Sequence, residues 1–396
     1  MLSASNLDVT EVLHTFSGVG IDCTFLVPTE TGLEKAIMDA TGSLRRYLQD
    51  EGIHDFGSQG QGPEHKKLVD AVIFSKGIHV ETTASLYRPN TKNGDPRIWF
   101  SRLKELAEPT DLLAVLASNG RLVVINCSKS NLGSLILNEK SPFWDYYQRK
   151  STDLPAEAQE LLHLLSLVSK RGFIQTMRSG DTGVGYTLET LLGISANSSK
   201  APDYKGIEIK SGRGKSVDSG RTTVFSQVPL WSFSRLKGSA DVLRERGRFN
   251  EKKQRRQLFH EIDARKANSY GLILVPDEKE GLLHQECQYA GKRMRDVSWK
   301  YDTLFQRLEE KHKQTFWVKA QAKGKGDAEQ FWYNDVKYTS GVNPLKLPLL
   351  IETGIISVDY TIKETPTGGA KDQGYLFKIR RSDLPLLFRS QMQLEL

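Results

Sequence analysis

The residues best suited to chemistry lie at positions 202–210, where the sequence reads PDYKGIEIK. Side chains alternate between the two faces of an extended strand, so Glu208 and Lys210 share one face while the neighbouring isoleucines turn to the other. Asp203 precedes Glu208 by a span of about 17 Å in a fully extended chain. A turn is therefore needed to bring the two carboxylates together, and Gly206 favours one.

Two carboxylates held close together repel each other, and such a site favours a divalent cation. Mg²⁺ fits best because it prefers few carboxylates, several waters and phosphate oxygens of a substrate. The ion would polarise a phosphodiester and activate a water, while Lys210 would orient or deprotonate that water or neutralise the oxyanion. A solvated strand face with an incidental ion pair fits the same residues, because the spacing arises by chance in about one chain in twelve. The triad alone leaves both interpretations open.

The elements that must position these residues follow a junction near residue 150. The polar stretch 150–156 contains Pro155 and predicts a domain boundary, with an amphipathic helix following from 156 to about 170. Further elements are expected as a helix at 185–194, strands at 207–211, 222–228, 270–275 and 315–321, and a helix at 298–311. The densely charged stretch 239–266 is expected to form one or two exposed helices, and a smaller lobe begins at about residue 328.

Three consecutive segments carry a resemblance to a known family: MRSGDTGVGYTLETLLGI at 177–194, PDYKGIEIKSGR at 202–213 and TTVFSQVPL at 222–230. Their succession resembles the MvaI/BcnI family of type II restriction endonucleases, which are related to the mismatch-repair enzyme MutH and have the PD-(D/E)xK nuclease fold. The positions that match the family pattern are Gly183, Gly185, Tyr186, Glu189, Gly193, Asp203, Gly206, Glu208 and Lys210. The likeness continues more weakly through most of residues 150–396.

This resemblance implies roles for the acidic residues and the lysine. Asp203 and Glu208 would be metal ligands for Mg²⁺, and Lys210 would be the catalytic lysine. Glu189 would support the metal site through a water or a neighbouring ligand. The alternative interpretation of Glu189 is a solvated residue on a helix face. However, Glu189 borders an apolar stripe, where an unpaired carboxylate would be costly.

The resemblance also implies residues that contact DNA. Lys311 or Lys313 would lie near the scissile phosphate, unless both simply end a helix in solvent. In the loop 367–374 and the strand after it, base edges would be read by Asp372, Gln373 and Arg380, and phosphates would be held by Lys378 and Arg381. Relatives often carry histidine in this loop and this chain has none there, so the target sequence is not carried over.

The implied fold class is α/β, with a restriction-endonuclease-like PD-(D/E)xK core at 151–325 and a small C-terminal DNA-recognition lobe at 326–396. A separate mixed α/β domain at 1–150 precedes the core. The resemblance does not cover this domain, which is expected to bind DNA or to regulate the enzyme, with a scaffold for protein partners as the alternative.

Composition agrees with an enzyme that acts on a polyanion. The 396 residues include 55 Lys and Arg against 48 Asp and Glu, a net charge of +7. Three distant cysteines exclude a disulfide scaffold and a cysteine-framed zinc site, and no signal peptide or membrane span is visible. We therefore expect a cytoplasmic protein with no membrane partner, and the resemblance implies an enzyme of a prokaryotic cell.

The predicted function is that of a sequence-specific, Mg²⁺-dependent endonuclease for double-stranded DNA, a type II restriction enzyme that cuts one strand at a time. It would act as a monomer and be paired genetically with a cognate DNA methyltransferase. The alternatives are a DNA nickase, a modification-dependent nuclease and a non-catalytic DNA-binding protein that keeps the fold.

Overall fold

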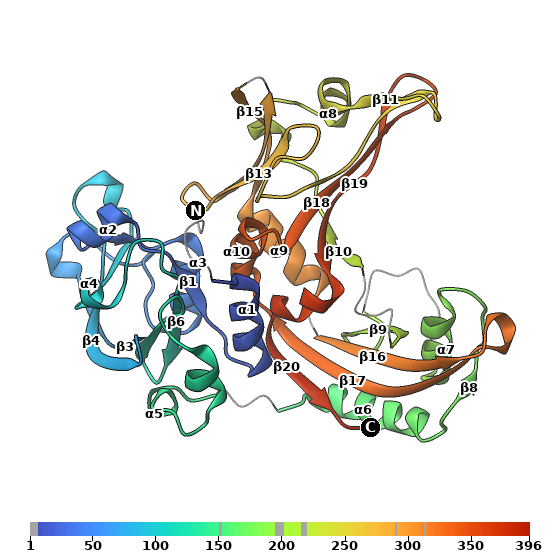
Figure 1. Cartoon of the computed structure of the whole chain (residues 1–396), viewed down its shortest axis with the longest axis horizontal. Coiled ribbons are helices and arrows are strands. Elements are labelled where there is room, and N and C mark those ends of the chain that lie inside the picture. The colour runs from blue at the N-terminus through green and yellow to red at the C-terminus, as the bar shows by residue number, and fades with distance from the viewer. Residues whose placement is uncertain (1–6, 150–152, 195–201, 215–219, 290, 313) are drawn as a thin grey trace.

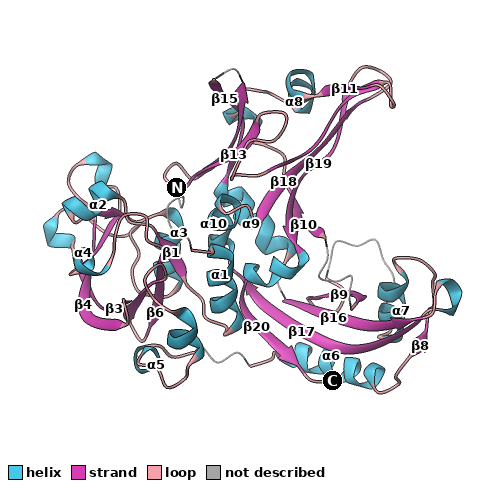
Figure 2. Cartoon of the chain, in the orientation of Figure 1, coloured by secondary structure: helices cyan, strands magenta, loops and turns pink. Residues whose placement is uncertain are grey.

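The computed structural model describes residues 7–149, 153–194, 202–214, 220–289, 291–312 and 314–396. Its strands form four sheets with helices packed against them, so the predicted α/β class is confirmed (Figures 1 and 2). The helices are α1 (Val9–Gly18), α2 (Glu30–Lys35), α3 (Gly42–Asp50), α4 (Leu103–Leu106), α5 (Phe143–Tyr146), α6 (Ala156–Ser169), α7 (Gly183–Leu191), α8 (Ser239–Arg246), α9 (Tyr301–Lys311) and α10 (Leu347–Glu352). None of these described helices has the length and apolar character needed to cross a membrane.

The N-terminal sheet has seven strands in the order β1-β6-β7-β3-β4-β5-β2. Their bounds are β1 Thr24–Leu26, β2 Met38–Asp39, β3 Lys67–Ser75, β4 Ile78–Tyr87, β5 Arg97–Phe100, β6 Leu113–Ser118 and β7 Arg121–Asn126. β6 is buried along its whole length and β7 along nearly all of it, as expected for central strands that read as continuous apolar runs. All seven strands come from the segment predicted as a separate domain.

A second sheet, the β9 sheet, carries the residues with the clearest chemistry. Its order is β20-β17-β16-β9, with β8 paired to β17. The strands are β8 Ile174–Gln175, β9 Ile207–Arg213, β16 Gln314–Lys323, β17 Gln330–Val342 and β20 Phe388–Leu394. β9 is an edge strand that pairs in parallel with β16, with Glu208 opposite Thr315. Leucines of α6 and α7 pack with β9, β16 and β17 in one apolar cluster, which fixes both helices against this sheet.

A third sheet, the β18 sheet, has the order β10-β19-β18-β12-β11 and packs against a three-stranded sheet, β13-β14-β15. The strands are β10 Arg221–Ser226, β11 Arg248–Asn250, β12 Arg255–Ile262, β13 Leu272–Asp277, β14 Leu282–Tyr289, β15 Lys292–Lys300, β18 Ile356–Glu364 and β19 Ala370–Arg380. Along β18, Val358, Tyr360 and Ile362 are buried, and the Tyr360 hydroxyl donates to Gln285 of β14. The alternate residues of β18 therefore lie on the opposite face of the sheet.

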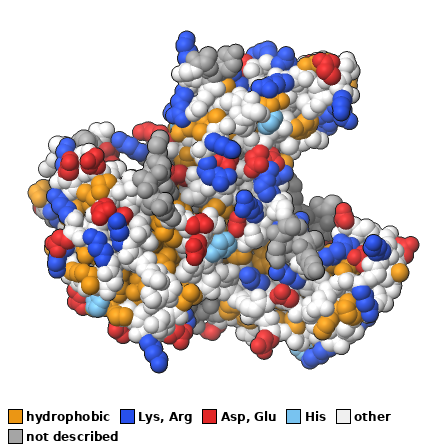
Figure 3. All heavy atoms as spheres, in the orientation of Figure 1, with side chains coloured by type: hydrophobic (Ala, Val, Ile, Leu, Met, Phe, Trp, Pro, Cys, Tyr) orange, Lys and Arg blue, Asp and Glu red, His pale blue; other side chains and the backbone are white. Residues whose placement is uncertain are grey.

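That opposite face borders a notch between the β18 sheet and the β9 sheet, which appears as a hollow in the surface outline (Figure 3). The N-terminal sheet lies on the other side of α1, α9 and α10, away from the notch (Figure 1). One continuous apolar cluster joins the N-terminal sheet to α9, α10 and the β18 sheet. The β9 sheet thus forms one side of the notch and the β18 sheet forms the other.

The expected boundary near residue 325 does not follow the sheets. Of the strands after it, β17 and β20 belong to the β9 sheet, while β18 and β19 pair with strands from 221–262. The reason is the short 324–329 connection, which keeps β17 next to β16 before α10 carries the chain across. The core and the predicted recognition lobe are therefore interleaved along the chain.

The prediction of exposed helices at 239–266 holds for the first two helical turns, 239–246, and is wrong for the rest of the stretch. α8 ends at Arg246, and a hairpin of β11 and β12 follows. A Cβ at Gly247 would lie 2.5 Å from the Leu243 carbonyl oxygen. The chain therefore needs glycine at the point where it leaves α8. The high charge of this stretch hid the two-residue alternation of β12, in which Leu258 is buried and Phe259 is 39% exposed.

Candidate active site

A two-residue turn solves the distance problem between the two carboxylates. Tyr204 and Ile207 exchange backbone hydrogen bonds of 2.9 and 2.7 Å across Lys205 and Gly206. Both turn residues have positive φ, 43° and 87°, the left-handed pair of a type I′ hairpin turn, which glycine adopts without strain. The chain before the turn consequently folds back along β9, as the turn predicted from Gly206 requires.

The turn seats Asp203 on the backbone of β9. Its Oδ2 accepts a hydrogen bond of 2.8 Å from the Ile209 N–H. Ile207 and Ile209 are 1% and 5% exposed, so Glu208 and Lys210 project from the open face of β9, as the alternation predicted. The Lys210 ammonium contacts the Glu208 carboxylate directly.

Helix α7 brings Glu189 to the same place. The helix packs on β9 so that a Cβ at Gly185 would meet Ser211 Oγ at 3.5 Å and Glu189 Oε1 at 3.8 Å, which is ordinary van der Waals contact. Its first turn is tight, because a Cβ at Gly183 would lie 2.2 Å from the Arg178 carbonyl oxygen. Close approach of the backbone thus explains Gly183 of the sequence pattern, whereas Gly185 has room for a side-chain carbon.

The carboxylates of this cluster influence one another. Burial raises the pKa of Glu189 above its ordinary value, and the negative charges of Asp203 and Glu208 raise it further against Lys210 and Arg178. Burial also raises the pKa of Asp203, with Glu208 adding to the effect, while the Ile209 N–H and Lys210 oppose it. Acidic groups that are partly desolvated and crowded by like charge gain most from a cation between them.

The donor set fits an open Mg²⁺ site. Within the described ranges, no three His, Cys, Asp or Glu side chains gather closely enough for a cage made by the protein alone. Mg²⁺ commonly takes one or two carboxylates and completes its shell with waters and substrate phosphate oxygens. Asp203 and Glu208 on one hairpin match that requirement, with Glu189 behind them.

Comparison with known proteins shows which family the chain belongs to. A model of the MvaI/BcnI restriction endonuclease family matches residues 162–388, which include α7, the hairpin and, apart from β20, the strands of both sheets that border the notch. The chain belongs to this family. It is therefore a site-specific deoxyribonuclease with a restriction-endonuclease-like core, as predicted from the sequence segments at 177–230.

Two solved structures of the restriction endonuclease MvaI are similar to this chain. One is titled as a complex with cognate DNA substrate and is 24% identical, with a TM-score of 0.48. The other is MvaI in the absence of DNA, 25% identical, with a TM-score of 0.46. Each match covers 61% of this chain and 99% of the other. A search of curated proteins found no match.

The residues predicted to contact DNA lie in different parts of the structure. Lys311 is exposed at the last turn of α9, next to His312, whose ring lies within electrostatic reach of Lys210 and Glu208. Lys313 lies outside the described residues. Arg380 is exposed at the end of β19 and lines a cavity of about 480 Å³.

The segment predicted as a reading loop is mostly strand. Residues 370–380 form β19, and Asp372 accepts a 2.7 Å hydrogen bond from Ser239 of α8. Asp372 is opposite buried Ile362, so it projects toward α8 and away from the notch face. Gln373 is exposed beside it.

The two predicted phosphate-binding residues also lie at the end of β19. Lys378 lies on the notch face and pairs with Asp359 at 2.9 Å. Arg381, which is exposed, begins the next short helical segment, 381–387.

A charged network on the notch face of the β18 sheet was not predicted from the sequence. Arg221 of β10 donates to Asp359 at 2.9 Å and to Glu261 at 2.8 Å, and also to Ser357. These residues come from three strands far apart in the chain, so only the strand pairing brings them together. Arg221 directly precedes the family segment 222–230, the one local signal that could have pointed to it.

Proposed function

We propose that this protein is a sequence-specific, Mg²⁺-dependent type II restriction endonuclease that binds double-stranded DNA in the notch. The observation that carries the proposal is the hairpin at Lys205 and Gly206, which puts Asp203 on the backbone of the strand that presents Glu208 and Lys210. The notch face of the β18 sheet stands over this hairpin and would read the duplex.

In this proposal Asp203 and Glu208 hold the ion, and Glu189 supports them through water. A bound Mg²⁺ would supply the charge that polarises a phosphodiester and makes a water more acidic. Lys210 exchanges its contact with Glu208 for one with the reacting phosphate, where its ammonium neutralises the developing oxyanion or orients the attacking water. Hydrolysis would leave 5′-phosphate and 3′-hydroxyl ends.

One such hairpin in the described part of the chain supports cleavage of one strand at a time. The protein would act as a monomer that rebinds to cut the second strand, and a cognate DNA methyltransferase would protect the host sites. Residues 1–150 would form an accessory domain that regulates the enzyme or binds DNA outside the notch. Its position behind α9 and α10 supports regulation over direct reading of the target (Figure 1).

The test is cleavage of supercoiled, unmethylated phage DNA with and without Mg²⁺, by wild type and by Lys210→Ala. We expect discrete fragments from the wild type only with Mg²⁺, and a loss of about a hundred- to a thousand-fold in the cleavage rate of the variant, as for other charge-stabilising groups. Lys205→Asn is the matched control, because it removes a lysine from the same hairpin at a position where asparagine tolerates positive φ.

Each alternative gives a different product. Nicked circles that persist would identify a nickase, and cleavage of methylated DNA alone would identify a modification-dependent nuclease. Tight, salt-sensitive binding without any cutting would leave a non-catalytic DNA-binding protein and overturn the proposed activity.

A further inference from the structure

The outer ends of two hairpins form an arm that projects beyond the notch. Residues 248–259 of β11 and β12 and residues 361–372 of β18 and β19 make up this arm, which points away from the rest of the molecule (Figure 1). Pairing runs across all four strands, with Gln257 opposite Lys363 and Lys363 opposite Lys371. Lys363 shares the notch face with Asp359 and Thr361, because the three alternate along β18.

The arm concentrates positive charge that the chain itself does not neutralise. Lys363 and Lys371 are direct cross-strand neighbours, an arrangement of like charges that weakens a sheet unless an anion lies between them. Lys252 and Lys253 are exposed in the turn between β11 and β12. Among the described residues, none of these four ammonium groups pairs with a carboxylate. The nearby Glu364 is engaged by the Arg256 backbone N–H at 2.8 Å.

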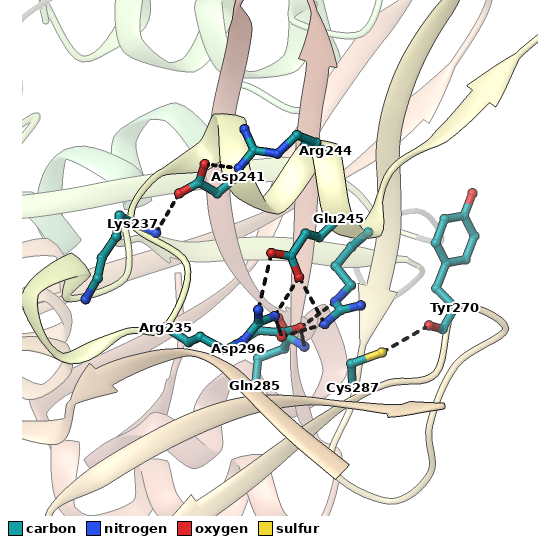
Figure 4. Close-up of polar contacts among 10 residues, drawn as sticks. Arg235, Lys237, Asp241, Arg244, Glu245, Tyr270, Gln285, Cys287 and Asp296 are labelled. Carbon is teal, nitrogen blue, oxygen red and sulfur yellow. Dashed lines mark hydrogen bonds and ion pairs between the residues drawn. The ribbon is translucent and has the colours of Figure 1, made fainter. Parts of the chain in front are cut away.

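A buried ionic network fixes the base of the arm. Asp296 of β15 is fully buried and accepts hydrogen bonds from Arg246 at 2.7 and 2.8 Å and from Arg235 at 2.6 Å (Figure 4). Arg246 ends α8 two residues before β11 begins, so the network holds the point from which the hairpin leaves. The hydrogen bonds from Arg246, Arg235 and Gln285 outweigh the effect of burial and hold the pKa of Asp296 below its ordinary value. The arm therefore presents its lysines from a fixed base, which lowers the entropy lost on binding.

We infer that the tip of this arm binds the phosphate backbone of duplex DNA outside the sequence held in the notch. This inference rests on the proposed function, because the notch must hold the duplex for the arm to reach its flank. Phosphate is the favoured ligand because a lysine ammonium is a compact, mobile point charge, the form in which lysine binds phosphate groups. Such contacts set affinity and register and carry no sequence information.

The experiment compares three variants of the full chain in metal-free DNA binding across a salt series. The first replaces Lys252, Lys253, Lys363 and Lys371 with glutamine, and the second replaces the same four with arginine. The control replaces four exposed lysines away from the notch with glutamine, namely Lys35, Lys76, Lys140 and Lys279. The probes are mixed-sequence duplexes of about 40 base pairs and of about 12 base pairs, the latter too short to leave the notch.

For the long duplex, the glutamine variant should bind at least about ten-fold more weakly at physiological salt, with a salt slope smaller in magnitude by about 2 to 4. The arginine variant and the control should match the wild type. For the short duplex all four proteins should agree. The glutamine variant should also cut phage DNA at low salt into the same fragments as the wild type, because the arm does not read bases.

Equal salt slopes for the wild type and the glutamine variant on the long duplex would overturn the inference, and so would a changed fragment pattern. Weakening of the control variant to the same degree would also overturn it, because general charge would then explain the effect. A wild type that neither binds nor cuts DNA would instead refute the proposed function, which keeps the two failures distinct.

Discussion

At the scale of single residues, the site combines groups whose charges conflict until a cation or a substrate arrives. Asp203 and Glu189 both have a raised pKa, first because they are partly buried and then because other carboxylates lie near them, Glu208 in the case of Asp203 and chiefly Asp203 in the case of Glu189. The activity of the enzyme should therefore fall on acidification at a pH above the ordinary carboxylate range, since both groups must be ionised to work.

Asp203→Asn should abolish cleavage, by about a thousand-fold or more, and raise the Tm of the metal-free protein. A carboxyl with a raised folded-state pKa stabilises the fold at pH below its unfolded pKa, and that contribution is lost as the pH rises through the folded pKa. At neutral pH the charge is thus unfavourable, while the amide oxygen still accepts from Ile209. Thermal unfolding at neutral and acidic pH measures this. A variant less stable than the wild type at neutral pH would contradict the explanation.

His312 lies between the two sheets that border the notch. Its Nε2 is 2.9 Å from the Val224 carbonyl of β10, so Nε2 carries the proton, and its ring meets Phe388 at the start of β20 edge-on. Burial lowers the pKa of His312 and keeps the ring neutral.

His312→Leu should lower the free energy of unfolding by about 1–3 kcal/mol, because it leaves the Val224 carbonyl without its donor. His312→Gln keeps an N–H donor and should lose less. Urea unfolding ranks the three proteins, and the idea fails if leucine and glutamine are equally destabilising.

At the scale of elements, the start of α7 shows how closely the chain must approach itself to seat the helix that carries Glu189. Gly183 was recognisable in the sequence as part of a family pattern, but the reason for a glycine there appears only where the helix meets the Arg178 carbonyl of the segment before it.

Gly183→Ala should destabilise the protein by about 1–3 kcal/mol and reduce activity, because the added methyl group overlaps the Arg178 carbonyl and displaces the helix that carries Glu189. Gly18→Ala in α1 is the matched control, with no atom within 4 Å of the new Cβ, and should be neutral or slightly stabilising. Urea unfolding and the cleavage rate check both. Normal stability in Gly183→Ala would show that the helix start adapts freely.

At the scale of the whole molecule, buried polar contacts join the N-terminal sheet region to the rest. Asp22 accepts a 2.7 Å hydrogen bond from Asn343 and lies 3.8 Å from the buried ammonium of Lys346. Arg389 of β20 reaches Asp22 at 3.6 Å and Asp50 at 2.9 Å. The N-terminal sheet region is thus packed firmly behind the notch.

Asp22→Asn should lower the free energy of unfolding by about 3 kcal/mol, because Lys346 is 5% exposed and would lose its nearest carboxylate. Asp50→Asn removes a carboxylate that is 35% exposed and should change stability by less than about 1 kcal/mol. Urea unfolding compares the two, and limited proteolysis would detect separation of the N-terminal part. Equal effects would show that burial does not decide the strength of this junction.

The sequence by itself determined the local features. Alternation placed Glu208 and Lys210 on the open face of β9, the position of Gly206 marked the turn, and the segments 177–230 identified the family, because each depends on neighbours along the chain. The tertiary structure decided what depends on strand pairing. It joined Arg221 to Asp359, turned Asp372 toward α8, and divided the residues after 325 between two sheets. Pairing between strands that are far apart in the sequence depends on which whole faces are buried together in the fold, so the local sequence pattern did not specify these contacts.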